Sequence, residues 1–173
     1  MTEIIATLGP IGTDSHRQAE QLGATVSLHE TFHAAVEHAK MHETKLLVPA
    51  GFREKRAGEQ YSWVDFHFEN LGVVELEKVW FEETMPMVLL HKSYESIAIH
   101  PSTSSLVLEL KKYKHIKHTR SKIQAYQLFK QGVASAVIAS TCMTSKESDH
   151  EYIKAQFNPT MVWCLYKIKS SKP

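Results

Sequence analysis

The residues best placed for chemistry lie in the run Thr7-Leu8-Gly9-Pro10-Ile11-Gly12-Thr13-Asp14-Ser15-His16. An apolar stretch ends abruptly there in Gly-Pro-x-Gly, and hydroxyl and carboxylate side chains follow. Glycine permits a tight turn, and Thr13, Asp14 or Ser15 can cap a following helix. A helix N-terminus directs free N–H groups at anions, so the run predicts a carboxylate or phosphate site. A turn without a ligand would use the same residues.

Two further polar turns could complete such a site. His100-Pro101-Ser102-Thr103-Ser104 follows an apolar strand, and Thr119-Arg120-Ser121 precedes a helical stretch. Arg120 could anchor a carboxylate by a bidentate contact, or it could be a solvated arginine in a first helical turn. His16 and His100 could transfer protons near neutral pH, although a surface role is the alternative for both. We expect catalysis at Thr13, Ser15 and His16, and substrate binding at Gly12, Asp14, Pro49, Ala50, His100, Ser102, Thr103, Thr119, Arg120 and Ser121.

His29-Glu30-Thr31-Phe32-His33 matches the H-E-x-x-H pattern of zinc proteases. That site needs both histidines on one face of a continuous helix. Because His29 follows the strand-like run 26–28, we expect it to precede the helix, and we expect no metal. Cys142 and Cys164 lie in apolar settings without a nearby base, which favours buried thiols over a nucleophile or a disulfide.

The order of the elements predicts how these turns meet. Strands are expected at 4–8, 24–28 and 45–49, with helices at 15–21 and 31–41, which is a β-α-β-α-β order typical of a parallel sheet. Ligands gather at the carboxyl ends of such strands, so the turns at Gly9, His29 and Pro49 should share one edge. Residues 53–60 are expected to form an exposed loop.

The second half repeats the strand, polar turn and helix pattern. We expect one long strand over 73–90 with a proline interruption, then a strand at 96–100, helices at 105–113 and 121–132, and a buried strand at 134–140. The run 161–168 returns the chain to its first part. The first lobe would then comprise 1–84 and 162–173, and the second lobe 85–161.

Composition excludes several classes of protein. The chain has 173 residues, of which 43% are hydrophobic, and 20 basic residues balance 19 acidic ones. This balance argues against nucleic acid or an anionic membrane as the main partner. No apolar run approaches the roughly 20 residues of a membrane span, and no signal segment opens the chain, so we expect a cytoplasmic protein. We expect no cofactor, and a homodimer is compatible with the sequence.

With these residues assembled, the chain resembles the catalytic domain of prephenate dehydratases, and more closely the prephenate decarboxylases of bacilysin biosynthesis. Residues 7–15 match the family's T/Y-L-G-P-x-G-T-x-S opening. Weaker matches are residues 27–32, Val48-Pro49, His100-Pro101-Ser102 and the strand 136–140. The resemblance implies an α/β fold of two lobes, like type II periplasmic binding proteins, with a ligand cleft between the lobes and a dicarboxylate substrate. It also implies a place in the aromatic amino acid pathway or in antibiotic biosynthesis, and we expect no regulatory domain.

The departures from the family pattern bear on the reaction. Dehydratases carry Thr-Arg-Phe where this chain has Met161-Val162-Trp163, so the hydroxyl that helps the ring hydroxide to leave is missing. The decarboxylases instead carry a Pro-Met-x-Trp run, which residues 159–163 fit with one insertion. The resemblance therefore implies a lyase that decarboxylates prephenate without aromatising it, with Met161 and Trp163 in catalytic positions beside the leaving carboxylate. A dehydratase with another acid, a non-catalytic anion-binding module, and a Trp163 that merely fills the core are the alternatives.

Overall fold

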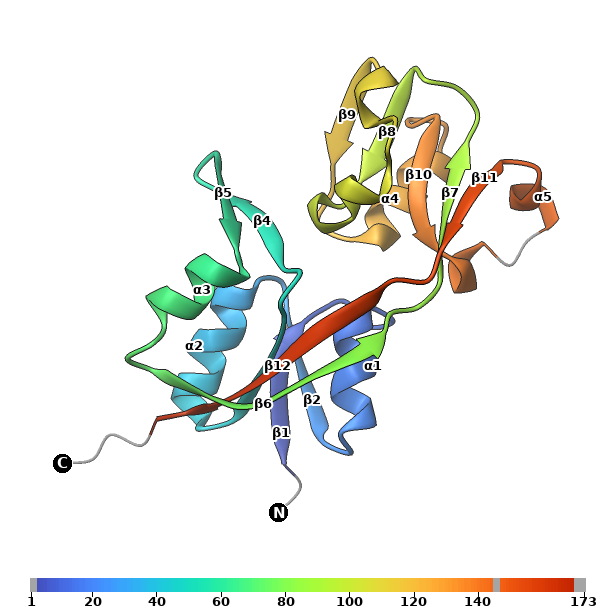
Figure 1. The fold of residues 1–173 in the computed structure, drawn as a ribbon. Helices are drawn as coiled ribbons and strands as arrows, with labels where there is room; N and C mark the ends of the chain where they lie inside the picture. The colour runs from blue at the N-terminus through green and yellow to red at the C-terminus, as the bar shows by residue number, and fades with distance from the viewer. Residues whose placement is uncertain (1–2, 145–146, 170–173) are drawn as a thin grey trace. The chain divides into compact units, whose positions relative to one another are not determined.

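The computed structural model describes residues 3–144 and 147–169, and the chain divides into two compact units. Unit 1 comprises residues 1–82 and 160–173, and unit 2 comprises residues 83–159 (Figure 1). The chain thus crosses between units after Glu82 and after Pro159. None of the helices in the described residues has the length and apolar character needed to cross a bilayer.

Unit 1 is built on a five-stranded sheet in the order β2-β1-β3-β12-β6. Strand β1 pairs in parallel with both β2 and β3, as the β-α-β-α-β pattern predicts, and β12 pairs antiparallel with β3. The bounds are β1 (Ile4–Leu8), α1 (Asp14–Gln21), β2 (Thr25–His29), α2 (Phe32–His42), β3 (Lys45–Pro49), β6 (Val74–Glu83) and β12 (Thr160–Ile168). The polar turns at Gly9, His29 and Pro49 consequently follow three neighbouring parallel strands.

Residues 53–60 do not form the expected loop. They make the hairpin of β4 (Arg53–Arg56) and β5 (Glu59–Ser62), which leads into α3 (Trp63–Glu69). Ala57 and Gly58 both have positive φ, at 51° and 87°, as a two-residue hairpin turn requires. The charged side chains of this segment hid the strand pattern because both of its faces are largely polar.

Each face of the unit 1 sheet carries its own hydrophobic core. Alternate residues of β12 enter the two cores, because successive side chains of a strand point to opposite faces. Trp163 and Leu165 pack with Ala19 of α1, whereas Cys164 and Tyr166 pack with the α2 side. This pattern explains why the run 161–166 is apolar or aromatic throughout.

Unit 2 has a second five-stranded sheet, in the order β11-β7-β10-β8-β9. Its elements are β7 (Met87–His91), β8 (Ser96–Ile99), η1 (Pro101–Leu106), η2 (Leu110–Lys112), β9 (His115–His118), α4 (Lys122–Lys130), β10 (Ala136–Ser140), η3 (Thr141–Met143), α5 (Glu147–His150) and β11 (Ile153–Phe157). Strand β8 lies parallel to both β9 and β10. The single strand expected over 73–90 is in fact two strands, β6 and β7, which belong to different sheets.

The helix expected over 105–113 is absent. Two 3₁₀ turns stand in its place, with bonds such as Thr103 N to His100 O (2.9 Å) and Val107 N to Ser104 O (3.2 Å). The hydroxyl of Thr103 also donates to His100 O, at 2.9 Å. Hydroxyl side chains that bond to the local backbone compete with helix formation, which is why the apolar spacing misled the prediction.

Candidate functional site

In the turn between β1 and α1 of unit 1, the polar side chains form hydrogen bonds within the turn itself. The hydroxyl of Thr13 accepts from His16 N (3.3 Å) and donates to Pro10 O (3.0 Å), so both of its hydrogen-bonding roles serve the helix cap. Gly12 has φ 86°, which a side chain would strain. Ser15 is buried at 6% exposure. Thr13 and Gly12 therefore shape the turn, and any anion bound here would meet the first amide groups of α1.

His16 is fixed within the same turn. Its Nδ1 lies 3.3 Å from Gly12 N and 3.5 Å from a carboxylate oxygen of Glu20. An amide donor needs a lone pair on Nδ1, whereas the carboxylate needs a proton there, so only one of these contacts forms at a time. With Gly12 as the partner the imidazole is neutral, and the proton on Nε2 is available to a ligand.

The turn after β3 is tied to β12. Ala50 N donates to Val162 O (2.8 Å), so this amide is unavailable to an anion, contrary to a binding role for Ala50 through its N–H. Pro49 pairs with Trp163 in the sheet. The side chain of Met161 lies against Gly51, where an added Cβ would stand 2.6 Å from the Met161 Cε. Gly51 is thus the residue that lets Met161 lie over this turn.

Trp163 lies in the core of unit 1. Its side chain is 1% exposed and packs with Ile5 and Leu47, which is the core-filling alternative considered from the sequence. Its indole N–H is buried and finds no acceptor among the described residues. An unsatisfied buried donor costs about 1–3 kcal/mol, so this N–H is an unused donor beneath the edge that carries the turns.

The strand ends of unit 2 bring two predicted turns and the end of a predicted strand to one edge. Strand β8 is parallel to both β9 and β10, so His100 after β8, Thr119 after β9 and Ser140 at the end of β10 lie at a single edge. Ser140 is fully buried, and neither its hydroxyl nor that of Ser104 has a hydrogen-bond partner in the part of the chain that the structure describes. Ser104 lies in η1 after β8 and Ser140 ends β10, so two unsatisfied hydroxyls stand at the edge where ligands of parallel strands gather.

His100 is neutral at physiological pH. Burial, assisted by the positive charges of Lys122 and His118, lowers its pKa to about 4. Its Nδ1 accepts from the amide of Ser102 (3.2 Å) and lies 2.6 Å from the Ser102 hydroxyl. A neutral imidazole fixed at Nδ1 can donate from Nε2, but it is not the acid or base near neutral pH that the sequence suggested.

The turn at 119–121 offers a cation next to a helix start. Ser121 caps α4 by accepting from Gln124 N (3.1 Å), and the Thr119 hydroxyl donates to Ser121 O (3.0 Å). Arg120 is exposed and bonds through its backbone N–H to the Gln124 side chain (2.9 Å), and within the described ranges its guanidinium forms no ion pair. The N–H groups of the Arg120 guanidinium are therefore available to bind a carboxylate.

The zinc-type motif does not lie on one helix. His29 ends β2, and Thr31 caps α2 by accepting from Ala34 N (3.1 Å), so the two histidines occupy different elements, as expected. Residues 3–144 and 147–169 contain no cluster of side chains arranged to hold a metal. Both cysteines are free, but Cys142 is exposed rather than buried.

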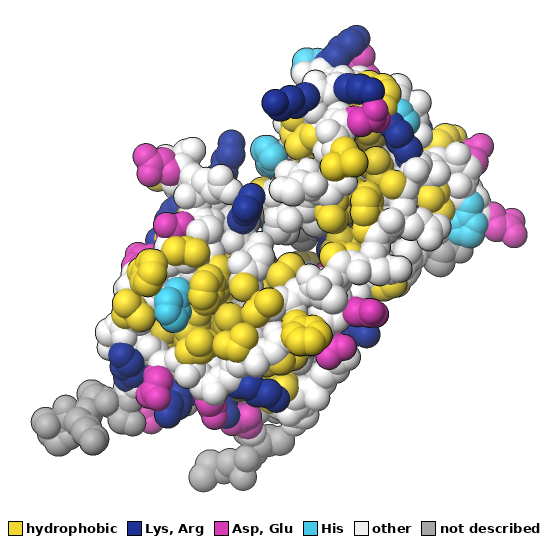
Figure 2. Space-filling model, viewed as in Figure 1, with side chains coloured by type: hydrophobic (Ala, Val, Ile, Leu, Met, Phe, Trp, Pro, Cys, Tyr) yellow, Lys and Arg dark blue, Asp and Glu magenta, His cyan; other side chains and the backbone are white. Residues whose placement is uncertain are grey.

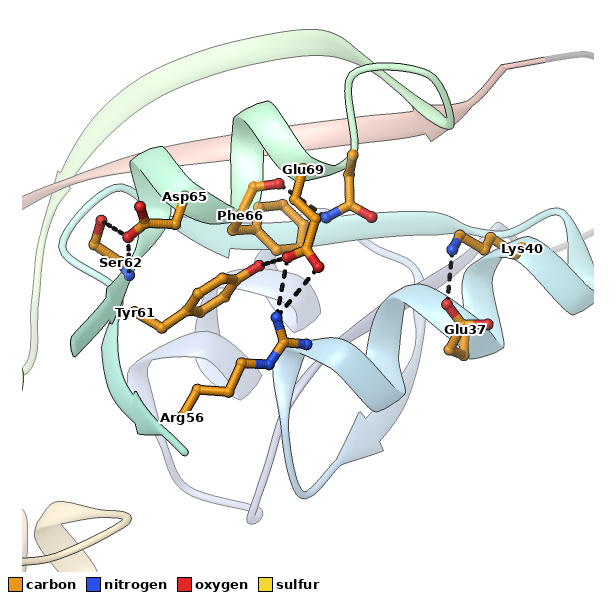
Figure 3. Close-up of polar contacts among 9 residues, drawn as sticks. Glu37, Lys40, Arg56, Tyr61, Ser62, Asp65, Phe66 and Glu69 are labelled. Atoms are coloured by element: carbon orange, nitrogen blue, oxygen red, sulfur yellow. Dashed lines mark hydrogen bonds and ion pairs between the residues drawn. The ribbon is translucent and has the colours of Figure 1, made fainter. Parts of the chain in front are cut away.

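An open pocket of about 440 Å³ lies by the β4–β5 hairpin and α3. Figure 3 shows that its main polar groups contact one another: Arg56 donates to Glu69 at 3.0 Å, and the Tyr61 hydroxyl donates to the same carboxylate. The Arg56 guanidinium also stands 4.5 Å from the centre of the Tyr61 ring. Since these groups satisfy each other, the pocket adds little unused donor or acceptor capacity.

The sequence did not single out Ser104 or Ser140 as site residues. Both stand in runs that it had identified, the polar turn 100–104 and the buried strand 136–140. The useful signal was positional, since each hydroxyl comes at or after the end of a parallel strand. Of the predicted residues, the structure groups Gly12 to His16 in unit 1, and His100 to Thr103 with Thr119 to Ser121 in unit 2.

No known family profile matches this sequence, and no curated protein matches it. Among solved structures, the chain is similar to a prephenate dehydratase from Arthrobacter aurescens, determined in complex with L-Phe, with 13% identity and a TM-score of 0.62 over 98% of this chain and 62% of that one. It is also similar to the prephenate dehydratase of Staphylococcus aureus, with 15% identity and a TM-score of 0.57 over 94% of this chain and 65% of that one. The chain thus spans less than two thirds of these dehydratases.

The periplasmic VFT2 domain of BvgS from Bordetella pertussis is similar as well, with 10% identity and a TM-score of 0.53 over 96% of this chain and 80% of that one. At such identities the likeness concerns the fold alone. The fold is two-lobed and prephenate dehydratase-like, and it is similar to that of the BvgS VFT2 domain as well.

Proposed function

We propose that this protein binds prephenate and decarboxylates it without aromatising the ring. The observation that carries the proposal is the strand edge of unit 2, where the hydroxyls of Ser104 and Ser140 are buried without partners among the described residues and the turn with Arg120 follows β9 at the same edge. Hydroxyl donors and an exposed guanidinium suit a carboxylate, and prephenate carries two.

The chemistry favours decarboxylation over dehydration. Dehydration needs an acid to help hydroxide leave, and Met161-Val162-Trp163 supplies no hydroxyl. In decarboxylation the bond to the ring carboxylate breaks, carbon dioxide leaves, and the electron pair passes into the ring diene, where a carbon takes up a proton. We assign His16 as the proton donor: when its Nδ1–H faces the Glu20 carboxylate the ring is an imidazolium, and the proton on Nε2 can pass to the ring carbon and leave a neutral imidazole. Met161 would keep water from the leaving carboxylate.

A binding module without catalysis is the second candidate. His100 is neutral with its Nδ1 engaged, and the Thr13 hydroxyl is used in the helix cap, so few groups remain for proton transfer. Such a module would bind the same carboxylates through Arg120 and the unit 2 hydroxyls.

Product analysis with pure protein and prephenate separates these functions. The assay belongs above neutral pH with a protein-free control, because acid converts prephenate spontaneously to phenylpyruvate. We expect a non-aromatic dihydro-hydroxyphenylpyruvate and carbon dioxide. Protein-dependent phenylpyruvate would instead identify a dehydratase, and saturable binding of prephenate without turnover would identify the binding module.

His16→Gln tests the assigned proton donor. The amide keeps much of the polarity of the imidazole but cannot transfer a proton, and general acid catalysis contributes about 10²–10⁴-fold to a rate. We expect kcat to fall by at least 100-fold while prephenate still binds. An unchanged kcat would remove His16 from the mechanism.

A further inference from the structure

Strand β9 forms an open edge of the sheet in unit 2 (Figure 1). It is the last strand in the order β11-β7-β10-β8-β9, and among the described residues β8 is its only neighbour in the sheet. All the residues of β9, His115–His118, are exposed. One side of this strand is therefore open to pairing with a further strand.

The hydrogen bonds at the two ends of β9 show which of its backbone groups face outward. The amide groups of His115 and Thr119 donate to carbonyl groups of the segment 95–99, at 3.1 Å and 3.0 Å, and the parallel register between β8 and β9 is unbroken. In such a pair every second residue bonds to the neighbouring strand, beginning here with His115. The N–H and C=O groups of Ile116 and His118 consequently point away from the sheet, and they form no hydrogen bond within the described ranges.

The side chains of β9 present different chemistry on the two faces of the sheet. Residues that are paired across neighbouring strands point to the same face. Ile116 is paired with Ile97 of one core, and Lys117 is paired with Ala98 of the core on the opposite face. Ile116 is 41% exposed. A strand that pairs with β9 would therefore meet a cation on one face and an apolar side chain on the other.

The surroundings of β9 are basic. Between Glu109 and Glu147 the sequence has eight lysine and arginine residues and no aspartate or glutamate. Figure 2 shows lysine and arginine side chains gathered on the part of unit 2 that carries β9. The carboxylate of Glu95 is paired with Lys114, at 2.7 Å, whereas Lys117 forms no ion pair with any described residue. The edge therefore has a cation to offer to an acidic partner.

We propose that β9 binds an extended segment of a partner protein, in which acidic side chains alternate with apolar ones, as an added strand. The backbone of this segment pairs with the outward groups of Ile116 and His118, its carboxylates lie beside Lys117, and its apolar side chains cover Ile116. Lysine on a sheet edge disfavours pairing with a second copy of the same strand, because like charges would then lie opposite each other. The same lysine favours an acidic strand. In addition, β9 has no Phe, Tyr or Trp on which the bases of a nucleic acid could stack.

Calorimetric titration of the full chain tests the proposal, and it is independent of prephenate because no residue assigned to that substrate is changed. The probe is a capped peptide of sequence Glu-Val-Glu-Val-Glu-Val-Glu. The comparison peptide has the same composition without the alternation, Glu-Glu-Val-Val-Val-Glu-Glu. We expect the alternating peptide to bind one-to-one with a dissociation constant on the order of 100 µM at low salt, and the comparison peptide to bind roughly tenfold more weakly.

Two variants separate backbone pairing from charge. Ile116→Pro removes an outward N–H and leaves the bonds to β8 in place, because proline is tolerated where the N–H of an edge strand faces solvent. Its affinity for the alternating peptide should be roughly three- to tenfold below that of Ile116→Ala, which keeps the N–H. Lys117→Glu should weaken binding by about fivefold or more. Lys55→Glu is the matched control: it changes the net charge equally, but Lys55 is exposed in β4 of unit 1, so this variant should bind the peptide unchanged.

Circular dichroism should show that every variant is folded. A chain that does not bind the alternating peptide up to about 1 mM would overturn the proposal. Equal affinity for the two peptides, or equal affinity of Ile116→Pro and Ile116→Ala, would overturn pairing through the backbone. Binding to phosphatidylserine vesicles or to oligouridylate that is tighter than peptide binding and is lost in Lys117→Glu would overturn the acidic peptide as the occupant of this edge.

Discussion

Replacing Ser140 by alanine should stabilise the protein and weaken ligand binding at the same time. Ser140 is fully buried at the end of β10, and its hydroxyl has no partner in the described residues. A buried hydroxyl without a partner costs about 1–3 kcal/mol, and Ser140→Ala removes that cost with little change of volume. We expect the free energy of unfolding to rise by about 1 kcal/mol, which is about 2–4 °C in Tm for a chain of this length.

The same hydroxyl should donate to a bound carboxylate. A hydrogen bond to a charged group contributes about 1.5–3 kcal/mol, so Ser140→Ala should weaken prephenate binding roughly ten- to hundredfold. Calorimetry measures both quantities, as thermal unfolding of the free protein and as titration with prephenate. The combination of higher stability and lower affinity identifies a hydroxyl that forms no hydrogen bond in the free protein and donates one to the bound ligand.

Two controls separate this effect from general ones. Thr44→Val also removes a buried hydroxyl that has no partner among the described residues, but this residue lies just before β3 in unit 1, so the change should raise stability and leave affinity unchanged. The Ser135 hydroxyl donates to Ser96 O (2.8 Å) and accepts from Ser96 N (2.9 Å), so Ser135→Ala should lower stability. A Ser140→Ala protein that is less stable, or that binds prephenate unchanged, would refute the reasoning.

Two further predictions follow from the geometry. The pKa of His100 is about 4 in the folded chain and 6.5 in the unfolded chain. Below pH 6.5 the unfolded chain therefore binds a proton that the folded chain does not, so the free energy of unfolding falls as the pH falls from 6.5 toward 4. The loss amounts to about 3 kcal/mol. Denaturant titrations at pH 7 and pH 4 should show that the free energy of unfolding falls by about 3 kcal/mol less in His100→Asn than in the original protein, and an equal fall in the two proteins would contradict the assignment. Gly51→Ala places a Cβ 2.6 Å from the Met161 Cε and should cost about 1–3 kcal/mol of stability. Met161→Ala in the same protein should relieve the clash, and a double variant no better than the sum of the singles would show that the clash is not the cause.

The sequence predicted the parts of the fold in which local pattern and packing agree. Strand 45–49 and the parallel β-α-β-α-β order were correct, because apolar strands alternate there with capped amphipathic helices. The strands β9 and β11 were missed because all four residues of β9 are exposed and the alternate residues Lys154 and Gln156 of β11 are exposed and polar. The division of 73–90 into two strands depends on which sheet each strand joins, and that information is not local.

The candidate site was predictable in its backbone but not in its side chains. Strand ends and turn residues identified both edges, since glycine, proline and hydroxyl residues mark such turns wherever they occur. Whether a hydroxyl is used locally or left unpaired is decided by contacts far along the chain. Thr13 and Ser140 are both hydroxyl residues near a strand end, yet the first caps a helix and the second has no partner in the part of the chain that the structure describes.

The last prediction concerns the independence of unit 2. Residues 83–159 form one continuous segment that contains all five strands of its sheet and the cores on both of its faces. Its two ends are joined, because Thr84 donates to Pro159 O through its backbone N–H (2.9 Å) and its hydroxyl (3.1 Å). Unit 1, by contrast, needs two separate segments of chain.

We therefore expect the isolated segment 83–159 to unfold in a single cooperative transition with urea. Because small domains bury a smaller share of their surface, its stability should be lower than that of the whole chain. Ser140→Ala should stabilise the segment by the same amount of about 1 kcal/mol, since β10 and the strands that pair with it, β7 and β8, all belong to unit 2. A segment without a cooperative transition would show that unit 2 depends on unit 1 for folding, and a stabilisation confined to the whole chain would place part of the Ser140 environment outside unit 2.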